Sequence, residues 1–120
     1  MWVSHLLQRL TYLLITHPDT PAQLAEAAQE YAHANAQLID ALAASKISAT
    51  SADGVNVWIN LRHRAAPVVD ALAARGWLVR DGAEFSLDST DDAVNHIRVT
   101  IHQLTPAQRK EFVADLVAVL

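Results

Sequence analysis

The chain has no cysteine, and only three of its 120 residues are glycine. The absence of cysteine excludes disulfide bonds and zinc–thiolate sites. Proline is also rare, with four residues, and 52% of the chain is apolar, which indicates a packed globule and not a disordered tail. At this length the chain forms one domain or a piece of a larger one.

Positive charge is scarce as well: nine Lys and Arg against 13 Asp and Glu give a net charge of −4. The basic cluster Arg62-His63-Arg64 is too short to bind a phosphate backbone well, so we expect no contact with nucleic acid. The apolar stretch Met1–Ile15 is interrupted by polar residues and lacks both a basic start and a small-residue cleavage site. These features argue against a membrane span or a signal peptide, and we expect a cytoplasmic protein.

Two helices are predicted at the start of the chain. Apolar residues recur at helical spacing in the first segment, at Val3, Leu6, Leu7, Leu10, Leu13 and Leu14. This helix should end near His17, because Pro18 disfavours helical geometry in the residue before it. In Thr20-Pro21-Ala22-Gln23, the threonine can cap a helix, the proline suits its first position and the glutamine completes a capping box. A long helix is therefore expected over residues 21–45.

The same four residue types return at 105–108 and predict a final helix. Its expected inner side carries Phe112, Val113, Leu116 and Leu120. Between the helices, alternating apolar residues predict strands at Val55–Leu61 and Ile97–His102. Shorter extended pieces are expected at Ile47–Thr50, Trp77–Arg80 and Ala83–Leu87, and a helix at Ala65–Arg75 that ends at Gly76. The fold class is α+β: a small mixed or antiparallel sheet of three to five strands, with helices packed on one face.

Three segments carry a resemblance to a known family: 53–61 (DGVNVWINL), 72–85 (LAARGWLVRDGAEF) and 97–101 (IRVTI). In this order they resemble the small C-terminal subdomain of fold-type I, pyridoxal-phosphate-dependent aminotransferases. The likeness is greatest to the MocR-type GntR regulators, which join a winged-helix DNA-binding domain to an aminotransferase-like domain. Trp2–Gln8 and the long helix with Tyr31 resemble the region where the large domain passes into the small one, so the resemblance covers essentially the whole chain.

The resemblance implies a single domain in three parts: an interface helix from the large domain at 1–17, a connecting helix at 20–46 and a small α+β subdomain at 47–120. It also implies that the chain begins after the family's cofactor lysine. We therefore expect this chain alone to hold no cofactor and to be no enzyme, although the resemblance implies that the intact protein binds pyridoxal phosphate. Lys46 is expected to be an exposed helix-end residue, at a position where the family often has glycine.

Arg98 is the main candidate for a functional residue. The resemblance implies that an arginine on this strand pairs with the α-carboxylate of the substrate, because its planar fork matches a carboxylate with two hydrogen bonds. The alternative is a surface arginine paired with Asp91 or Asp92. Phe85 is a candidate to line the same pocket, and core packing is its alternative.

Ser4 and His5 match positions that the resemblance places near the cofactor phosphate or the subunit interface, but solvent exposure is the favoured interpretation. The six histidines show no i, i+4 pair and no HExxH pattern, so no metal site is expected. Trp58 and Trp77 are expected to pack in the core or against a helix.

The leading hypothesis is a C-terminal fragment of a pyridoxal-phosphate-dependent, aminotransferase-like transcriptional regulator. It would close over the cofactor and amino-acid site of the intact protein and supply Arg98. A fragment of a catalytic class I/II aminotransferase is one alternative, and a free-standing α+β interaction module without cofactor is another. Without the large domain, the first helix should drive self-association through Trp2–Ile15, unless it folds back over its own sheet.

Overall fold

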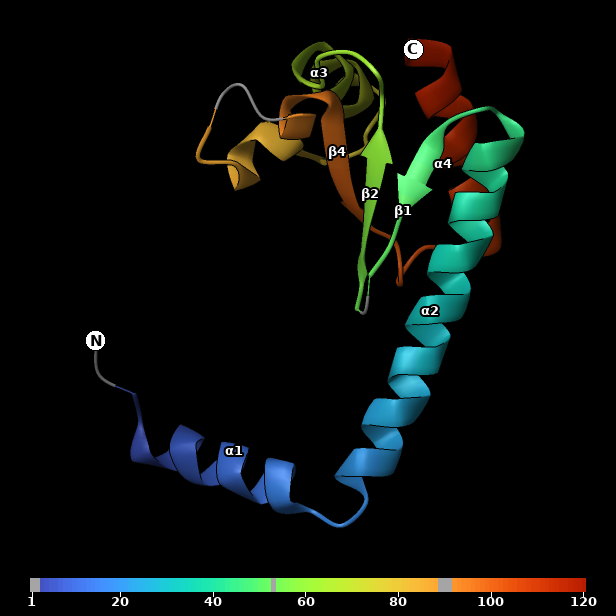
Figure 1. The fold of residues 1–120 in the computed structure, drawn as a ribbon. Coiled ribbons are helices and arrows are strands. Elements are labelled where there is room, and N and C mark those ends of the chain that lie inside the picture. Colours follow the sequence, from blue (N-terminus) through green and yellow to red (C-terminus); the bar gives the residue numbers. More distant parts are fainter. Residues whose placement is uncertain (1–2, 53, 89–91) are drawn as a thin grey trace.

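The computed structural model describes residues 3–52, 54–88 and 92–120. Two helices lead into a small sheet (Figure 1), which has four strands. In chain order the elements are α1 (His5–Thr16), α2 (Thr20–Ala44), β1 (Ser48–Thr50), β2 (Asn56–Asn60), α3 (Ala66–Ala74), β3 (Arg80–Asp81), the 3-10 helices η1 (Gly82–Phe85) and η2 (Asp92–Asn95), β4 (His96–Thr100) and α4 (Pro106–Val119).

The sheet is antiparallel throughout, with the strand order β1-β2-β4-β3. In the central pair, Val57 lies opposite Val99 and Ile59 opposite Ile97. Because successive side chains of a strand point to opposite faces, these four share one face, and all four are buried. Arg98, which lies between two of them on β4, belongs to the other face.

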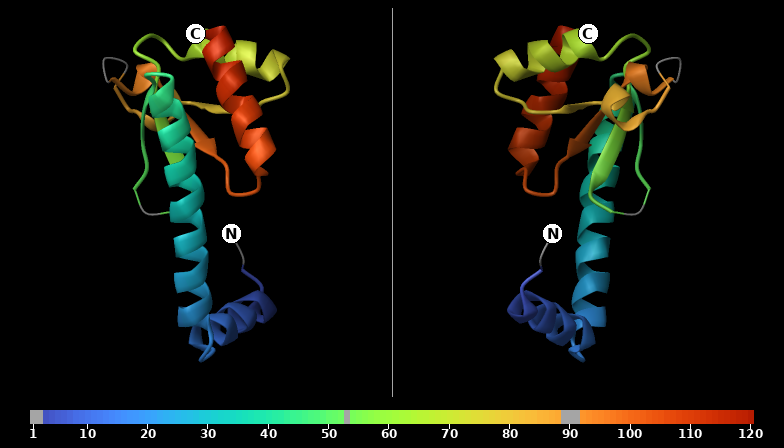
Figure 2. Two further views of the ribbon diagram at one scale, coloured as in Figure 1. Left: turned by 90° about the vertical axis from the view of Figure 1, so that its right-hand side faces the viewer. Right: turned by 90° about the vertical axis from the view of Figure 1, so that its left-hand side faces the viewer.

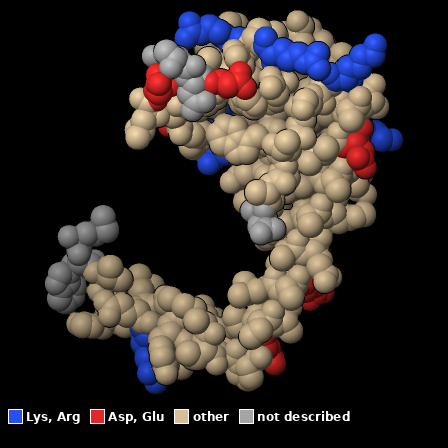
Figure 3. Space-filling model, viewed as in Figure 1, with Lys and Arg blue, Asp and Glu red and all other residues tan. Residues whose placement is uncertain are grey.

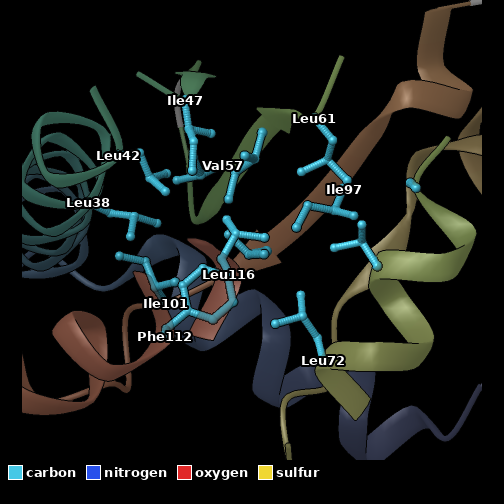
Figure 4. Packing of buried hydrophobic residues seen from close by; sticks show 14 residues of the cluster. Leu38, Leu42, Ile47, Val57, Leu61, Leu72, Ile97, Ile101, Phe112 and Leu116 are labelled. Atoms are coloured by element: carbon cyan, nitrogen blue, oxygen red, sulfur yellow. The ribbon is translucent and has the colours of Figure 1, made fainter. Parts of the chain in front are cut away.

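The C-terminal half of α2, together with α3 and α4, covers the apolar face of the sheet (Figure 4). The predicted α+β class with helices on one face of a small sheet is therefore confirmed. On α4 the expected inner residues Phe112 and Leu116 are buried and Val113 packs against them, whereas Leu120 is exposed, contrary to expectation. The buried apolar residues are Leu38, Leu42, Ile47, Val57, Ile59, Leu61, Ala65, Val68, Leu72, Ile97, Val99, Ile101, Phe112 and Leu116.

The two Thr-Pro-Ala-Gln segments behave differently. At α4 the Thr105 hydroxyl accepts a hydrogen bond from the Gln108 backbone N–H, and the Gln108 side chain accepts one from the Thr105 N–H, which confirms this capping box. At α2 the predicted cap is wrong. Asp19 precedes that helix without capping it, and the Thr20 hydroxyl donates to the Leu14 carbonyl oxygen of α1. Since the end of α1 holds this hydroxyl, it does not cap α2.

Helices α2 and α3 end in the same hydrogen-bonding motif. After α3, the N–H groups of Gly76 and Trp77 donate back to helix carbonyls, and Gly76 has a φ of 91°, as its predicted role at the helix end requires. After α2, Lys46 and Ile47 make the equivalent hydrogen bonds. Lys46 has a φ of 61°, a backbone conformation that favours glycine. Its side chain is exposed, as expected.

Strand β3 is shorter than predicted, because only Arg80–Asp81 pair with β4. The Trp77 indole N–H donates to the Asp115 carboxylate of α4 at 2.8 Å, and the Trp77 ring meets Phe112 edge-to-face at 5.4 Å between centroids. These contacts hold residue 77 against α4, so the ladder with β4 begins only at Arg80.

The segment Ala83–Leu87, predicted to be extended, is also different. Its first part belongs to η1, where the Asp81 side chain accepts a hydrogen bond from the Ala83 N–H at 2.9 Å and so caps the helix. Gly82, the first residue of η1, is buried against the backbone of η2 and the start of β4. The turn of η1 carries Phe85 over the uncovered face of the sheet.

Helix α1 stands away from the sheet, at the far end of α2 (Figures 1 and 2). It has no buried residue, so it does not fold back over its own sheet. The radius of gyration is 17.4 Å, whereas a compact domain of this length has about 14 Å. Within the described residues, no helix combines the length and the apolar character needed to cross a membrane.

Candidate functional site

A row of three large side chains crosses the uncovered face of the sheet. Arg98, on the central strand β4, lies opposite Trp58 of β2 on one side and opposite Arg80 of β3 on the other. Residues directly opposite in an antiparallel ladder project to the same face, with their Cβ atoms about 5 Å apart. The register therefore gathers two guanidinium groups and an indole on the face that the three helices leave open.

Phe85 of η1 lies over this row. The Cζ atom of Arg98 is 3.9 Å from the centroid of the Phe85 ring, and the Cζ atom of Arg80 is 5.9 Å from it. Trp58 meets the same ring edge-to-face, with 5.6 Å between centroids and an angle of 82°. A guanidinium stacked on a ring keeps the N–H donors at its edge free to bind a planar anion.

The charges around Phe85 are unequally paired. Arg80 forms an ion pair and hydrogen bond with Glu84 of η1. The hydrogen bond from Arg80 is the largest cause that lowers the pKa of Glu84, and the positive charge of Arg98 contributes a smaller part in the same direction. In the described part of the chain, Arg98 makes no ion pair within 4.0 Å. Glu84 therefore pairs with Arg80, and Arg98 has no such partner among the described residues.

The alternative pairing of Arg98 with Asp92 is wrong. The Asp92 carboxylate accepts a hydrogen bond from the Asn95 side chain at 2.9 Å and lies 3.8 Å from Nδ1 of His96. Asp91 lies outside the described residues. The charge of Arg98 instead helps to lower the pKa of Glu84, after the larger contributions of Arg80.

The position of Phe85 depends on how η1 packs. A Cβ atom at Gly82 would lie 2.2 Å from the Ala93 carbonyl oxygen and 2.7 Å from the His96 carbonyl oxygen. The backbones of η1, η2 and β4 therefore touch directly, and this contact fixes the turn that carries Phe85. The His96 ring lies 6.3 Å from Trp58 and completes the aromatic edge of the site.

The structure brings together two of the residues that the sequence singled out. Phe85 contacts Arg98 and is 42% exposed, so its alternative role in the core is wrong. Trp77 packs against the core as expected, but Trp58 lies half-buried on the uncovered face, where it was not expected. Sequence reasoning also missed Arg80 and Glu84. Only the register of β3 on β4 reveals them.

Ser4 and His5 lie at the start of α1, which Figure 1 shows far from the sheet. Both are exposed, and the Ser4 carbonyl oxygen accepts a hydrogen bond from the Gln8 N–H at 3.0 Å. The described residues therefore do not bring Ser4 to Arg98. The part of the chain that the structure describes also contains no cluster of His, Asp or Glu that could hold a metal ion.

Neither lysine fits a cofactor site in these residues. Lys46 is exposed in the turn after α2, and Lys110 of α4 lines a groove of about 250 Å³ between α2 and α4, on the covered side of the sheet. A Schiff-base lysine needs a pocket that lowers its pKa and holds the cofactor ring. The described residues offer neither lysine such a pocket.

By fold and site, the chain is an antiparallel α+β unit with an arginine and aromatic site, suited to anions, on the uncovered face of its sheet. No family model matches it. It is similar to the vitamin B6 salvage pathway transcriptional repressor PtsJ of Salmonella typhimurium strain LT2, with 33% identity over 115 residues. The alignment covers 96% of the chain and 26% of the repressor, so the chain spans about a quarter of the length of that protein.

Proposed function

We propose that this chain is the C-terminal part of a transcriptional regulator with a pyridoxal-phosphate-dependent, aminotransferase-like region. The similarity to a transcriptional repressor over 96% of the chain supports the regulator. The name of that repressor refers to vitamin B6 salvage, and pyridoxal phosphate is the cofactor form of vitamin B6. The cofactor and the aminotransferase-like parent are both part of the proposal.

In this proposal the chain supplies the group that binds the carboxylate of an amino-acid ligand. The observation that carries it is Arg98, stacked on Phe85 at 3.9 Å on the uncovered sheet face and without an ion pair among the described residues. A carboxylate accepts two parallel hydrogen bonds from a guanidinium edge, and such charge-assisted pairs are about twice as strong as neutral hydrogen bonds. Phe85 holds the guanidinium plane, and Trp58 supports the Phe85 ring edge-to-face.

The cofactor belongs to the rest of the protein. When bound, pyridoxal phosphate supplies an aldehyde that reacts with amines. The residues of this chain do not bind its ring or its phosphate in this proposal. They cover the site and orient the ligand through its carboxylate.

The test is the ligand affinity of the longer protein that contains this chain, with Arg98→Ala compared with the wild type. Losing a charge-assisted bidentate pair costs a few kcal/mol, so amino-acid affinity should fall on the order of 10²-fold. Cofactor absorbance and DNA binding should stay unchanged. Arg64→Ala is the matched control, because Arg64 is exposed and lies outside the row. Equal amino-acid affinity in wild type and Arg98→Ala would remove Arg98 from the site.

The coding sequence next to the part that encodes this chain distinguishes between a regulator and an enzyme. A winged helix joined to an aminotransferase-like domain supports the regulator. An aminotransferase-like domain alone, together with measurable transamination by the intact protein, would replace the regulator with a catalytic aminotransferase. Arg98 keeps its role in both cases, so the affinity test and the sequence test are independent.

A further inference from the structure

The positive charge next to Arg98 has no role in the function proposed so far. Arg80 lies directly opposite Arg98 in the β3–β4 ladder, and like charges in that position repel each other. Both Cζ atoms lie close to the same Phe85 ring, at 5.9 Å and 3.9 Å from its centroid. The two guanidinium carbons are therefore no farther apart than the sum of these distances. Two cations at this separation form a site for two negative charges.

Glu84 already occupies one of the two positions. Its carboxylate pairs with Arg80, and it comes from η1, the same turn that carries Phe85. Both partners remain substantially exposed, with 60% of the Arg80 side chain and 43% of the Glu84 side chain accessible. An exposed pair of this kind is worth about 0.2–1 kcal/mol, so an incoming carboxylate can displace Glu84.

We propose that Arg98 and Arg80 together bind a ligand with two carboxylates, and that Glu84 occupies the Arg80 position until the ligand displaces it. This inference rests on the carboxylate-binding role of Arg98 proposed above. One carboxylate binds the edge of Arg98. The other binds Arg80, and the released Glu84 turns toward solvent. Glu84 therefore reduces the advantage of a dicarboxylate over a monocarboxylate.

The test measures binding of three probe anions to the 120-residue chain by nitrogen-15 NMR of the arginine Nε–H and tryptophan indole signals. The probes are acetate, succinate and inorganic phosphate, each titrated at constant ionic strength because exposed charges are screened by salt. The variants are Arg98→Gln, Arg80→Gln and Glu84→Gln, with Arg64→Gln as the control. The backbone spectrum of each variant shows that the fold is intact.

We expect the wild type to prefer succinate to acetate. Arg80→Gln should remove that preference and leave acetate binding at Arg98 within about twofold. Glu84→Gln should tighten succinate binding by about 1.4- to fivefold, the equivalent of the 0.2–1 kcal/mol of an exposed ion pair, and should change acetate binding less. Arg98→Gln should weaken both anions.

Two results would overturn the inference while the role of Arg98 stands. One is a succinate-to-acetate ratio that Arg80→Gln leaves unchanged. The other is tighter binding of phosphate than of succinate, if Arg98→Gln and Arg80→Gln each abolish the phosphate binding. The two arginines would then bind one dianion together. If Arg98→Gln leaves acetate and succinate binding unchanged, the proposed function fails as well. The three failures are therefore distinguishable.

Discussion

Gly82 lies directly against the backbone of Ala93, so close that a Cβ atom on Gly82 would come within 2.2 Å of the Ala93 carbonyl oxygen. The obstacle is backbone, which cannot move aside as the end of a flexible side chain can. This contact joins η1 to η2, and η1 carries both Phe85 and Glu84. Because glycine has only a hydrogen atom in place of a Cβ atom, η1 can lie over Arg98.

Gly82→Ala should destabilise the chain and displace Phe85 from Arg98. Overpacking of a close contact costs about 1–3 kcal/mol, and the free energy of unfolding in urea should fall by that amount. The Arg98 Nε–H signal should also move, because it loses the nearby ring. Ala83→Ser is the control, since Ala83 is exposed and should change stability by less than about 0.5 kcal/mol. Unchanged stability in Gly82→Ala would mean that η1 and η2 separate easily.

Two substitutions at the matching ends of α2 and α3 should have opposite effects on the free energy of unfolding. Lys46 and Gly76 occupy equivalent positions, with φ of 61° and 91°. The left-handed conformation costs a residue with a side chain about 1 kcal/mol. Lys46→Gly should therefore raise the free energy of unfolding by about 1 kcal/mol, and Gly76→Lys should lower it by at least as much. Urea unfolding of both variants checks this, and a loss of stability in Lys46→Gly would contradict it.

Acid sensitivity should depend on Asp115 of α4. The hydrogen bond from the Trp77 indole is the largest cause that lowers the pKa of Asp115 below its ordinary value of 3.8, and the hydrogen bond from Arg75 follows. Because the folded-state pKa is the lower one, the carboxylate stabilises the fold fully above its ordinary pKa. That contribution is lost as the pH falls through the folded-state pKa.

Asp115→Asn should therefore be less stable than the wild type near neutral pH, and the difference should shrink as the pH falls below the ordinary pKa of 3.8. The urea midpoints of both proteins, measured from about pH 6 to about pH 2.5, give the comparison. Glu84 has a lowered pKa for a similar reason, so Glu84→Gln serves as a second variant that changes acid sensitivity without affecting Trp77. Parallel pH profiles for wild type and Asp115→Asn would contradict the assignment.

The periodic parts of the fold could be predicted from the sequence. Ile97, Val99 and Ile101 are buried as the alternation indicates, and Gly76 ends its helix as expected. The failures occur where a tertiary contact overrides a local pattern. Thr20 is followed by the same three residue types as Thr105, but its hydroxyl donates to the end of α1.

The site was predictable only in part for the same reason. Arg98 is visible as a polar residue in an apolar strand. Its contacts with Phe85 and Arg80 depend on the register of β3 and on the turn at Gly82. Both depend on packing between segments that are distant in the sequence, such as Trp77 on Asp115. A local pattern carries no information on these contacts.

Helix α1 presents an apolar stripe to solvent. Its members are exposed: Val3 53%, Leu6 76%, Leu7 56%, Leu10 49%, Leu13 48% and Leu14 59%. Figure 3 shows α1 and the first half of α2 as a largely uncharged surface beside a hollow below the sheet. Leaving such side chains in water forgoes roughly 1.5–3 kcal/mol each. This is large against a total stability of about 5–15 kcal/mol, so the stripe should find a partner.

We therefore expect the isolated chain to self-associate through α1, most simply as a two-fold dimer in which the stripe meets its own copy. Light scattering should show a dimer for the wild type and a monomer for the double variant Leu6→Glu/Leu10→Glu. Gln8→Glu is the control: it adds a negative charge on the opposite side of the helix, at 100° per residue, and should leave the dimer intact. A wild type that stays monomeric at high concentration would contradict the expectation, because nothing else in the described residues covers α1. A dimer that survives Leu6→Glu/Leu10→Glu would move the contact to another surface.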